Sequence, residues 1–140
     1  MEKRTIVDAG PIIAVLISGD KHHTWARELW AQLEPPVHTC EAVLSEAQHV
    51  VKRVGGNPRA VLEFLRNGVI QVAFSVEHEV ERLLQLQSTY ADVPMSLAEA
   101  CLVRMAELHE HVRVLTTDSD FHIYRRNRRQ VIPLLVPPGI

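Results

Sequence analysis

Four acidic residues stand where carboxylates can act together on a bound cation. Asp8 and Asp118 each follow a short run of β-branched and apolar residues that is typical of a strand. Because parallel strands end at the same edge of a sheet, these two side chains are expected to converge there. Glu46 lies on a segment with helical spacing of apolar residues, beside the apolar face, so it can border the core.

Glu99 is the most informative of the four. Residues 97–106 are apolar apart from Glu99 and Arg104, and a carboxylate in such surroundings is costly unless a positive charge compensates it. The candidate ligands are all oxygen donors, and no cluster of histidines and cysteines has metal-ligand spacing. Oxygen donors alone favour a hard cation, so the sequence predicts Mg²⁺ or Mn²⁺ as the cofactor.

Each of these residues also has a structural alternative. Asp8 can hydrogen-bond the amides of a turn ahead of the next helix, and Glu46 can be a solvated helix residue. Ser96 and Glu99 form the S-x-x-E pattern of a capping box, in which the glutamate serves the first turn of its own helix. Asp118 and the aspartate two residues later can cap a turn. The functional interpretation therefore depends on the joint occurrence of the carboxylates.

The elements that must position these residues alternate between strands and helices. RTIV and the apolar part of RVLTTD are typical strands, and a turn and a helix follow the first of them. Further strands are expected over residues 37–39, 69–75 and 131–136, and helices over 23–33, 40–54, 58–68, 76–87 and 96–111. Pro133 suggests that the last strand lies at a sheet edge. This alternating order favours an α/β domain with a parallel sheet.

Composition agrees with one compact domain. The chain has 140 residues, of which 46% are hydrophobic and 5% aromatic. Aliphatic residues suit a parallel sheet covered by helices, and a chain of this length can bury roughly two thirds of its unfolded surface. A single domain over residues 1–140 is therefore expected.

The formal net charge of −2 gives no global attraction for nucleic acid, so a polyanion must be met by a local basic patch. The segment YRRNRR supplies such a patch, because arginine guanidinium groups bind phosphate with two donors at once. Lys52, Arg53 and Arg59 can extend it. The alternative is a solvated face of a terminal helix. The candidate nucleic-acid-binding residues are Arg125, Arg126, Arg128 and Arg129.

The two cysteines and the first residues of the chain bear on its environment. Cys40 and Cys101 lie far apart, and neither has a neighbour at zinc-finger spacing, so both are expected to be free, buried thiols. The opening MEKRTIV lacks the apolar stretch of a signal peptide or a membrane-spanning helix. A cytoplasmic protein without membrane association is expected.

Three blocks of the sequence resemble the PIN-domain family of metal-dependent nucleases, many of which are VapC-type toxins of bacterial toxin–antitoxin pairs. The blocks are IVDAGPIIAVL, YADVPMSLAEACLVRMAE and VLTTDSDFHIYR. With the glutamate of AVLSEA they cover nearly the whole chain in the order of the family. The resemblance implies a three-layer α/β/α sandwich with a central, mostly parallel sheet.

The resemblance also assigns site residues by position. It implies that Asp8 is the first-strand aspartate of the family, Glu46 its helix glutamate and Asp118 its late aspartate, with Asp120 in a supporting metal-binding place. One threonine of TTD is similar to the small hydroxyl residue that often precedes the late aspartate. The family more commonly has aspartate where this chain has Glu99, which puts the metal spacing and the activity in question. The nearby acidic residue that could take over is Asp92.

For function, the resemblance implies a Mg²⁺- or Mn²⁺-dependent endoribonuclease that leaves 5′-phosphate and 3′-hydroxyl ends. It implies the toxin of a type II toxin–antitoxin pair, homodimerisation and a small antitoxin partner. The preference for RNA over DNA comes from the family alone. The alternative from another class is a non-catalytic or weakly active PIN-like module that binds RNA or a partner, consistent with the departure at Glu99.

Other enzyme classes fit the sequence less well. A histidine-based ribonuclease would need no metal, and the chain has eight histidines, including His22, His23, His109 and His111. Most of them fall at expected helix ends or loops. A haloacid-type phosphatase needs a second aspartate where this chain has Gly10, a phosphoaspartate receiver needs a late lysine that is not evident, and the glycine fingerprint of a Rossmann domain is absent.

Overall fold

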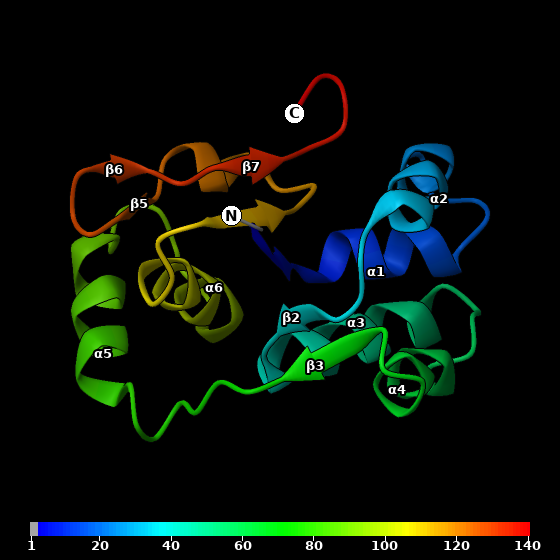
Figure 1. Cartoon of the computed structure of the whole chain (residues 1–140), viewed down its shortest axis with the longest axis horizontal. Coiled ribbons are helices and arrows are strands. Elements are labelled where there is room, and N and C mark those ends of the chain that lie inside the picture. The colour runs from blue at the N-terminus through cyan, green and yellow to red at the C-terminus, as the bar shows by residue number, and fades with distance from the viewer. Residues whose placement is uncertain (1–2) are drawn as a thin grey trace.

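The computed structural model describes residues 3–140 and is built around one five-stranded sheet (Figure 1). The strand order is β3-β2-β1-β4-β7, and all four pairings are parallel. The strands are β1 (Arg4–Val7), β2 (Val37–Thr39), β3 (Ile70–Val72), β4 (Val112–Leu115) and β7 (Leu134–Leu135). The sheet is therefore parallel throughout, and β1 and β4 lie next to each other in its middle.

Within residues 3–140, six α-helices flank the sheet in the expected three-layer α/β/α arrangement. They are α1 (Ala9–Leu16), α2 (His23–Gln32), α3 (Glu41–Arg53), α4 (Arg59–Arg66), α5 (Val80–Thr89) and α6 (Leu97–Glu107). A 3₁₀ helix follows β4 at Ser119–His122, and a small antiparallel hairpin pairs β5 (Arg125–Arg126) with β6 (Gln130–Val131). No helix within residues 3–140 has the length and apolar character needed to cross a membrane.

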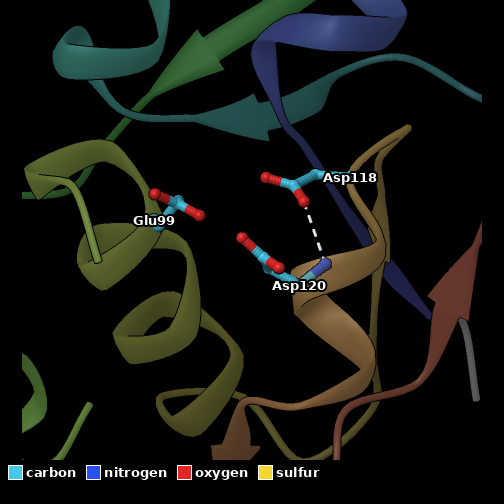
Figure 2. A group of neighbouring side chains, drawn as sticks. All are labelled: Glu99, Asp118 and Asp120. Atoms are coloured by element: carbon cyan, nitrogen blue, oxygen red, sulfur yellow. Dashed lines mark hydrogen bonds between the residues drawn. The ribbon is translucent and has the colours of Figure 1, made fainter. Parts of the chain in front are cut away.

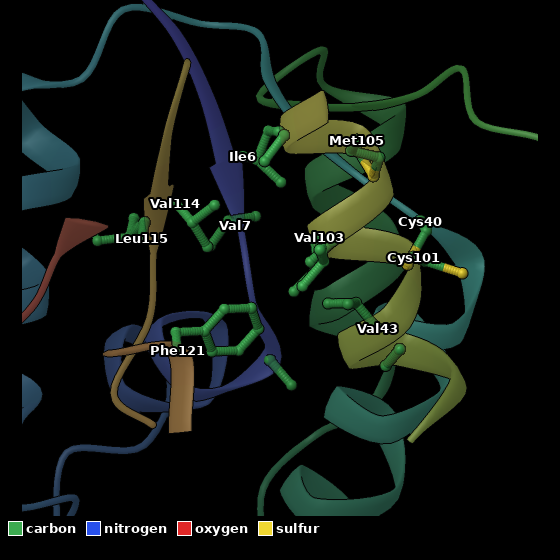
Figure 3. Close-up of a cluster of buried hydrophobic side chains, with 14 of the residues drawn as sticks. Ile6, Val7, Cys40, Val43, Cys101, Val103, Met105, Val114, Leu115 and Phe121 are labelled. Atoms are coloured by element: carbon green, nitrogen blue, oxygen red, sulfur yellow. The ribbon is translucent and has the colours of Figure 1, made fainter. Parts of the chain in front are cut away.

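The core forms where α6 packs on the two central strands. Figure 3 shows Ile6 of β1 on the side of α6, whose Val103 points toward the strands, and Val114 of β4 is in register with Ile6 on the same face. Seven of the eleven residues of α6 are buried, which explains its apolar sequence, and α3 lies alongside it. Each Å² of apolar surface that is buried stabilises the fold by about 25 cal/mol, so the packing of α6 on the strands contributes to stability. It also fixes the position of Glu99 at the first turn of α6.

Two expected elements differ from those in the structure, and one alternative that the sequence left open does not occur. The helix expected from residue 76 begins only at Val80, because residues 76–79 form a turn in which the Glu79 amide donates to the carbonyl of Ser75. The strand expected over 131–136 is divided at Ile132–Pro133 into β6 and β7, and β7 does lie at the sheet edge. The segment YRRNRR forms the β5–β6 hairpin and no helix.

Candidate active site at the carboxyl edge of the sheet

Asp8 is fixed between the two central strands. The register of β1 and β4 pairs Val7 with Leu115, so Asp8 and Thr116 leave the sheet side by side. One carboxylate oxygen of Asp8 accepts a hydrogen bond from the Ala9 amide at 2.8 Å and caps α1. The other oxygen accepts from the Thr116 hydroxyl at 2.8 Å. The turn-capping alternative for Asp8 is therefore realised, and the side chain still faces the strand that carries Asp118.

Thr116 connects Asp8 to the two later aspartates. Its hydroxyl oxygen accepts from the Asp118 amide at 3.0 Å, and Asp118 in turn caps the 3₁₀ helix by accepting from the Asp120 amide at 2.9 Å. Gly10 lies directly against the neighbouring Thr117, and a Cβ at position 10 would collide with the Thr117 hydroxyl. The sequence could not show which of the two threonines is the linking residue, and the structure identifies Thr116.

Glu99 performs the capping role and also faces the aspartates. Its Oε1 accepts from the Ser96 amide at 2.9 Å, and the Ser96 hydroxyl accepts from the Glu99 amide, which completes the capping box of α6. Its Oε2 accepts from the Tyr124 hydroxyl at 3.0 Å. The carboxylate is thus held on both oxygens at the helix start.

Three carboxylates converge from two elements. Figure 2 shows Glu99 of α6 pointing toward Asp118 and Asp120 of the segment after β4. One oxygen from each of the three lies within 4.8 Å of the other two. Asp92, the reserve candidate, is exposed in the loop before α6 and is not part of this group.

Glu46 and Asp8 lie outside that close group but within its electrostatic reach. Partial burial raises the pKa of Glu46, and the negative charges of Glu99 and Asp118 raise it further. Burial raises the pKa of Asp8 from 3.8 to about 6, against the lowering effect of its two hydrogen bonds, and Glu46 and Asp118 again add to the rise. The four predicted carboxylates therefore share one electrostatic environment.

The carboxylates repel one another, and a cation would relieve that repulsion. Burial is the largest cause of the raised pKa of Asp120, and the negative charges of Asp118 and Glu99 raise it further. Like charges held this close disfavour full ionisation, and a positive ion between them reverses the effect. The donors are carboxylate oxygens only, which fits Mg²⁺ or Mn²⁺ and does not suit a soft metal.

The four arginines predicted to bind nucleic acid divide into two pairs. The Arg125 guanidinium donates to the carbonyls of residues 122–124, and Arg126 donates to those of residues 106, 109 and 110, at and beyond the last turn of α6. Arg128 and Arg129 are exposed in the hairpin turn. The turn forms because Asn127 and Arg128 take positive φ angles of 50° and 73°, and asparagine tolerates that conformation well.

A basic hollow lies beside this hairpin. Arg82, Tyr90, Arg125 and Arg128 are among the residues that line a cavity of about 360 Å³. The Tyr90 hydroxyl accepts from the Arg125 amide, and the Tyr90 ring packs edge-on against Tyr124, which holds Glu99. The hollow is therefore linked to the acidic group through two tyrosines. Lys52, Arg53 and Arg59, proposed from the sequence to extend the patch, lie on α3 and α4.

Tyr124 is a site residue that the sequence did not reveal. It is fully buried, and its pKa is raised by burial, by its hydrogen bond to Glu99 and by the surrounding negative charges. It stands 25 residues from Glu99 in an irregular segment, so no periodic pattern could connect the two. The likeness of VLTTDSDFHIYR to the family was the only signal in that segment.

The two cysteines are free and buried, as expected. The structure adds that they lie close together, because Cys40 precedes α3 and Cys101 lies on the neighbouring α6. The neighbouring Cys101 thiol and the first amides of α3 lower the pKa of Cys40, whereas the Cys40 thiol and burial raise the pKa of Cys101. They join the helices that carry Glu46 and Glu99.

Within residues 3–140, no histidine belongs to the acidic group. The His23 ring hydrogen-bonds the carbonyl of Ala14, and His109 hydrogen-bonds Arg4 at the amino end of β1. Within residues 3–140, the one group of potential metal ligands contains carboxylates and no histidine. The geometry gives no support to a histidine-based ribonuclease.

Comparisons with known proteins agree with this arrangement. The family model described as PIN domain matches residues 5–127. The toxin VapC20 of Mycobacterium tuberculosis, described as cleaving the sarcin–ricin loop, superposes with a TM-score of 0.78 at 22% identity, over 92% of this chain and 99% of that chain. A toxin–antitoxin complex from Klebsiella pneumoniae gives 0.60 at 19% identity, over 84% and 89%. A comparison with curated protein sequences finds no match.

Proposed function

This chain belongs to the PIN-domain family, and from that premise we propose that it is a divalent-metal-dependent endoribonuclease that hydrolyses RNA phosphodiester bonds. Residues 1–140 form the single nuclease domain. In the cell it acts as the toxin of a type II toxin–antitoxin pair.

The convergence of Glu99, Asp118 and Asp120 is the observation that supports this proposal most directly. The residues come from α6 and from the segment after β4, so only the folded chain brings them together. The capping box satisfies Glu99 locally, but it would not require two aspartates at the same place. Mutual repulsion of this kind persists in proteins where function needs it.

Glu99, Asp118 and Asp120 would hold the cation, with Asp8 and Glu46 alongside. A bound divalent cation supplies Lewis-acid chemistry, which makes water more acidic and neutralises charge on phosphate oxygens. The chain's own contribution is orientation. Thr116 keeps Asp8 and the Asp118 segment in register, and Tyr124 with Ser96 holds both oxygens of Glu99.

Arg128 and Arg129 of the hairpin turn are the residues that attract the RNA backbone. They are exposed and carry no structural hydrogen bond that would compete with phosphate among the side-chain contacts of residues 3–140. Arg125 lines the adjoining hollow while it also caps the 3₁₀ turn. Arg126 has a structural role at the end of α6 and contributes little to binding.

The partners follow from the same family membership. We propose a homodimer and a small antitoxin protein that covers the acidic group of Glu99, Asp118 and Asp120, in a cytoplasmic setting. The similarity to a chain of a toxin–antitoxin complex supports the antitoxin partner.

The decisive experiment measures cleavage of a structured RNA with Mg²⁺ or Mn²⁺ and with EDTA. Asp118→Asn and Asp8→Asn should each reduce cleavage by at least about 10²-fold, because each removes a charge that faces the cation. Glu28→Gln on the exposed face of α2 is the matched control and should leave cleavage unchanged.

The proposal is wrong if both aspartate variants cleave at the rate of the parent protein, or if EDTA has no effect. The hydrogen bonds on both oxygens of Glu99 favour one alternative, a PIN-like module that binds RNA without cutting it. That alternative predicts RNA binding that is unchanged by EDTA and no cleavage at any metal concentration.

A further inference from the structure

A second, larger cavity lies at the opposite edge of the sheet, where the strands begin. Its volume is about 670 Å³. Arg4, His38 and Arg113 reach it from β1, β2 and β4, Lys3 precedes β1, and the loop 34–36 closes one side. We call it the amino-edge cavity. Because a four-residue strand such as β1 spans about 13 Å, it is separate from the carboxylates at the other edge.

The amino-edge cavity is basic although the chain as a whole carries a net charge of −2. Three cationic side chains line it, against one carboxylate, that of Glu34. Both arginines are oriented by neutral partners. Arg4 hydrogen-bonds His109 at 2.7 Å, and the Arg113 Nε donates to the Thr5 hydroxyl at 2.9 Å. Within residues 3–140, the ion pairs of the molecule involve other arginines.

His38 lines the amino-edge cavity and has one unpaired polar atom, which lies below the surface. Its Nδ1 is buried and finds no hydrogen-bond partner among residues 3–140. Burial lowers the pKa of His38, and the positive charge of Arg4 and the neighbouring His109 lower it further. An anion bound in the cavity would offset the positive charge of Arg4 that acts on His38.

The ligand that matches these features carries phosphate and an apolar ring. Forked guanidinium donors and an ammonium group suit phosphate oxygens, and a volume of about 670 Å³ falls within the range of small-ligand sites. The exposed rings of Pro35 and Pro36 provide a surface for a flat base. The Glu34 carboxylate can accept from an amino or hydroxyl group.

We propose that the amino-edge cavity binds a nucleoside phosphate, with Lys3, Arg4 and Arg113 holding the phosphate. The source is either a free nucleotide or the phosphorylated end of an RNA strand, which share this chemistry. The site does not depend on the proposed nuclease activity, because its residues lie at the other edge of the sheet.

The test is calorimetric titration of the full chain, with chelator present so that no RNA is cut. The probes are inorganic phosphate, adenosine 5′-monophosphate, and a short oligoribonucleotide with or without a 5′-phosphate. Arg113→Gln should weaken binding by about tenfold, and Lys3→Gln, at an exposed position, by a smaller factor. Arg27→Gln on α2 is the matched control and should bind as the parent protein does. Asp118→Asn should also bind normally, which separates this site from the carboxylates.

A second readout is the imidazole signal of His38 in NMR titrations. A bound phosphate should raise its pKa, because the added negative charge offsets the positive charge of Arg4. Binding of adenosine monophosphate supports a free nucleotide, and binding of the 5′-phosphorylated oligonucleotide alone supports an RNA end. The proposal fails if no probe binds, if inorganic phosphate binds as tightly as the nucleotide, or if Arg113→Gln and Arg27→Gln weaken binding equally.

Discussion

At the scale of single residues, burial of Asp8 couples folding of the metal-free protein to pH. Its pKa is about 6 in the folded protein against an ordinary value of 3.8. The folded state therefore holds the proton to higher pH than the unfolded chain, and stability falls as the pH rises from about 4 to about 6. The expected loss is of the order of 2–3 kcal/mol, and chemical denaturation in chelator at several pH values measures it.

Asp8→Asn is the variant that isolates this effect. Because it removes the buried charge, the metal-free variant should be more stable than the parent protein at pH 7, and its stability should change less between pH 4 and 6. Glu28→Gln should retain the parental pH dependence. An equal loss of stability across this interval in parent and Asp8→Asn would show that another group is responsible.

Tyr124 is expected to be a positioning residue for Glu99. Tyr124→Phe removes the hydroxyl that donates to Glu99 Oε2 but keeps the buried ring. Groups that orient metal ligands typically contribute 10–100-fold to metal affinity, so the variant should bind Mn²⁺ about tenfold more weakly. Tyr90→Phe is the matched control, since the Tyr90 hydroxyl accepts from the Arg125 amide instead. Equal Mn²⁺ affinities of the two variants by calorimetry would contradict the assignment.

What the sequence could predict about the site depended on where each residue stands in its element. Asp8 and Asp118 follow apolar runs that mark strand ends, so their convergence was predictable from the parallel sheet. Glu99 was visible because its neighbours are apolar. Tyr124 was not predictable, because its contact with Glu99 is made through the tertiary fold and leaves no pattern in the sequence. The same is true of the pairing of Cys40 with Cys101.

At the scale of elements, the apolar periodicity predicted the five-stranded arrangement better than it predicted the connections. The strands β1, β2, β3 and β4 and the helices α3 and α6 lie within or close to the expected ranges, since buried elements carry the strongest patterns. For YRRNRR the sequence left a terminal helix open as an alternative, because its polar residues carry no periodic pattern, and the structure shows a hairpin there. The positive φ angles of Asn127 and Arg128 that form the hairpin come from local backbone preferences and from packing against α6.

Arg126 connects that hairpin to α6, and its removal should cost stability. Its guanidinium donates to three carbonyls at and beyond the last turn of α6, where a cation also meets the negative end of the helix dipole. Arg126→Ala should destabilise the protein by about 1–2 kcal/mol in urea denaturation. Arg129→Ala, at an exposed position of the same hairpin, should change stability by less than about 0.5 kcal/mol.

The effects of these two variants on RNA binding should be in the opposite order to their effects on stability. Arg129→Ala should weaken RNA binding and reduce its salt dependence, because this side chain is free to meet phosphate. Arg126→Ala should affect RNA binding only through the fold. Identical stability of the two variants would contradict the structural role of Arg126.

At the scale of the whole molecule, the sheet separates charges of opposite sign. The carboxylates gather where the strands end, and the basic residues of the amino-edge cavity lie where they begin. A net charge of −2 conceals this separation, and the sequence indicated a basic patch only at the hairpin arginines, with Lys52, Arg53 and Arg59 as its extension. The amino-edge cavity was not predictable, because Arg4, His38 and Arg113 belong to three strands whose order in the sheet must be known first.

Because the carboxylates repel one another in the absence of a cation, divalent metal should raise the thermal stability of the entire domain. A ligand that binds only the folded state at 100 times its Kd stabilises it by about 2.7 kcal/mol. For a domain of this size, this corresponds to a rise in Tm of several degrees. Scanning calorimetry with Mn²⁺ and with EDTA measures the shift, which Asp118→Asn should largely abolish and Glu28→Gln should retain. If Mn²⁺ moves the Tm of Asp118→Asn as far as that of the parent protein, the ion is bound at a place other than these carboxylates.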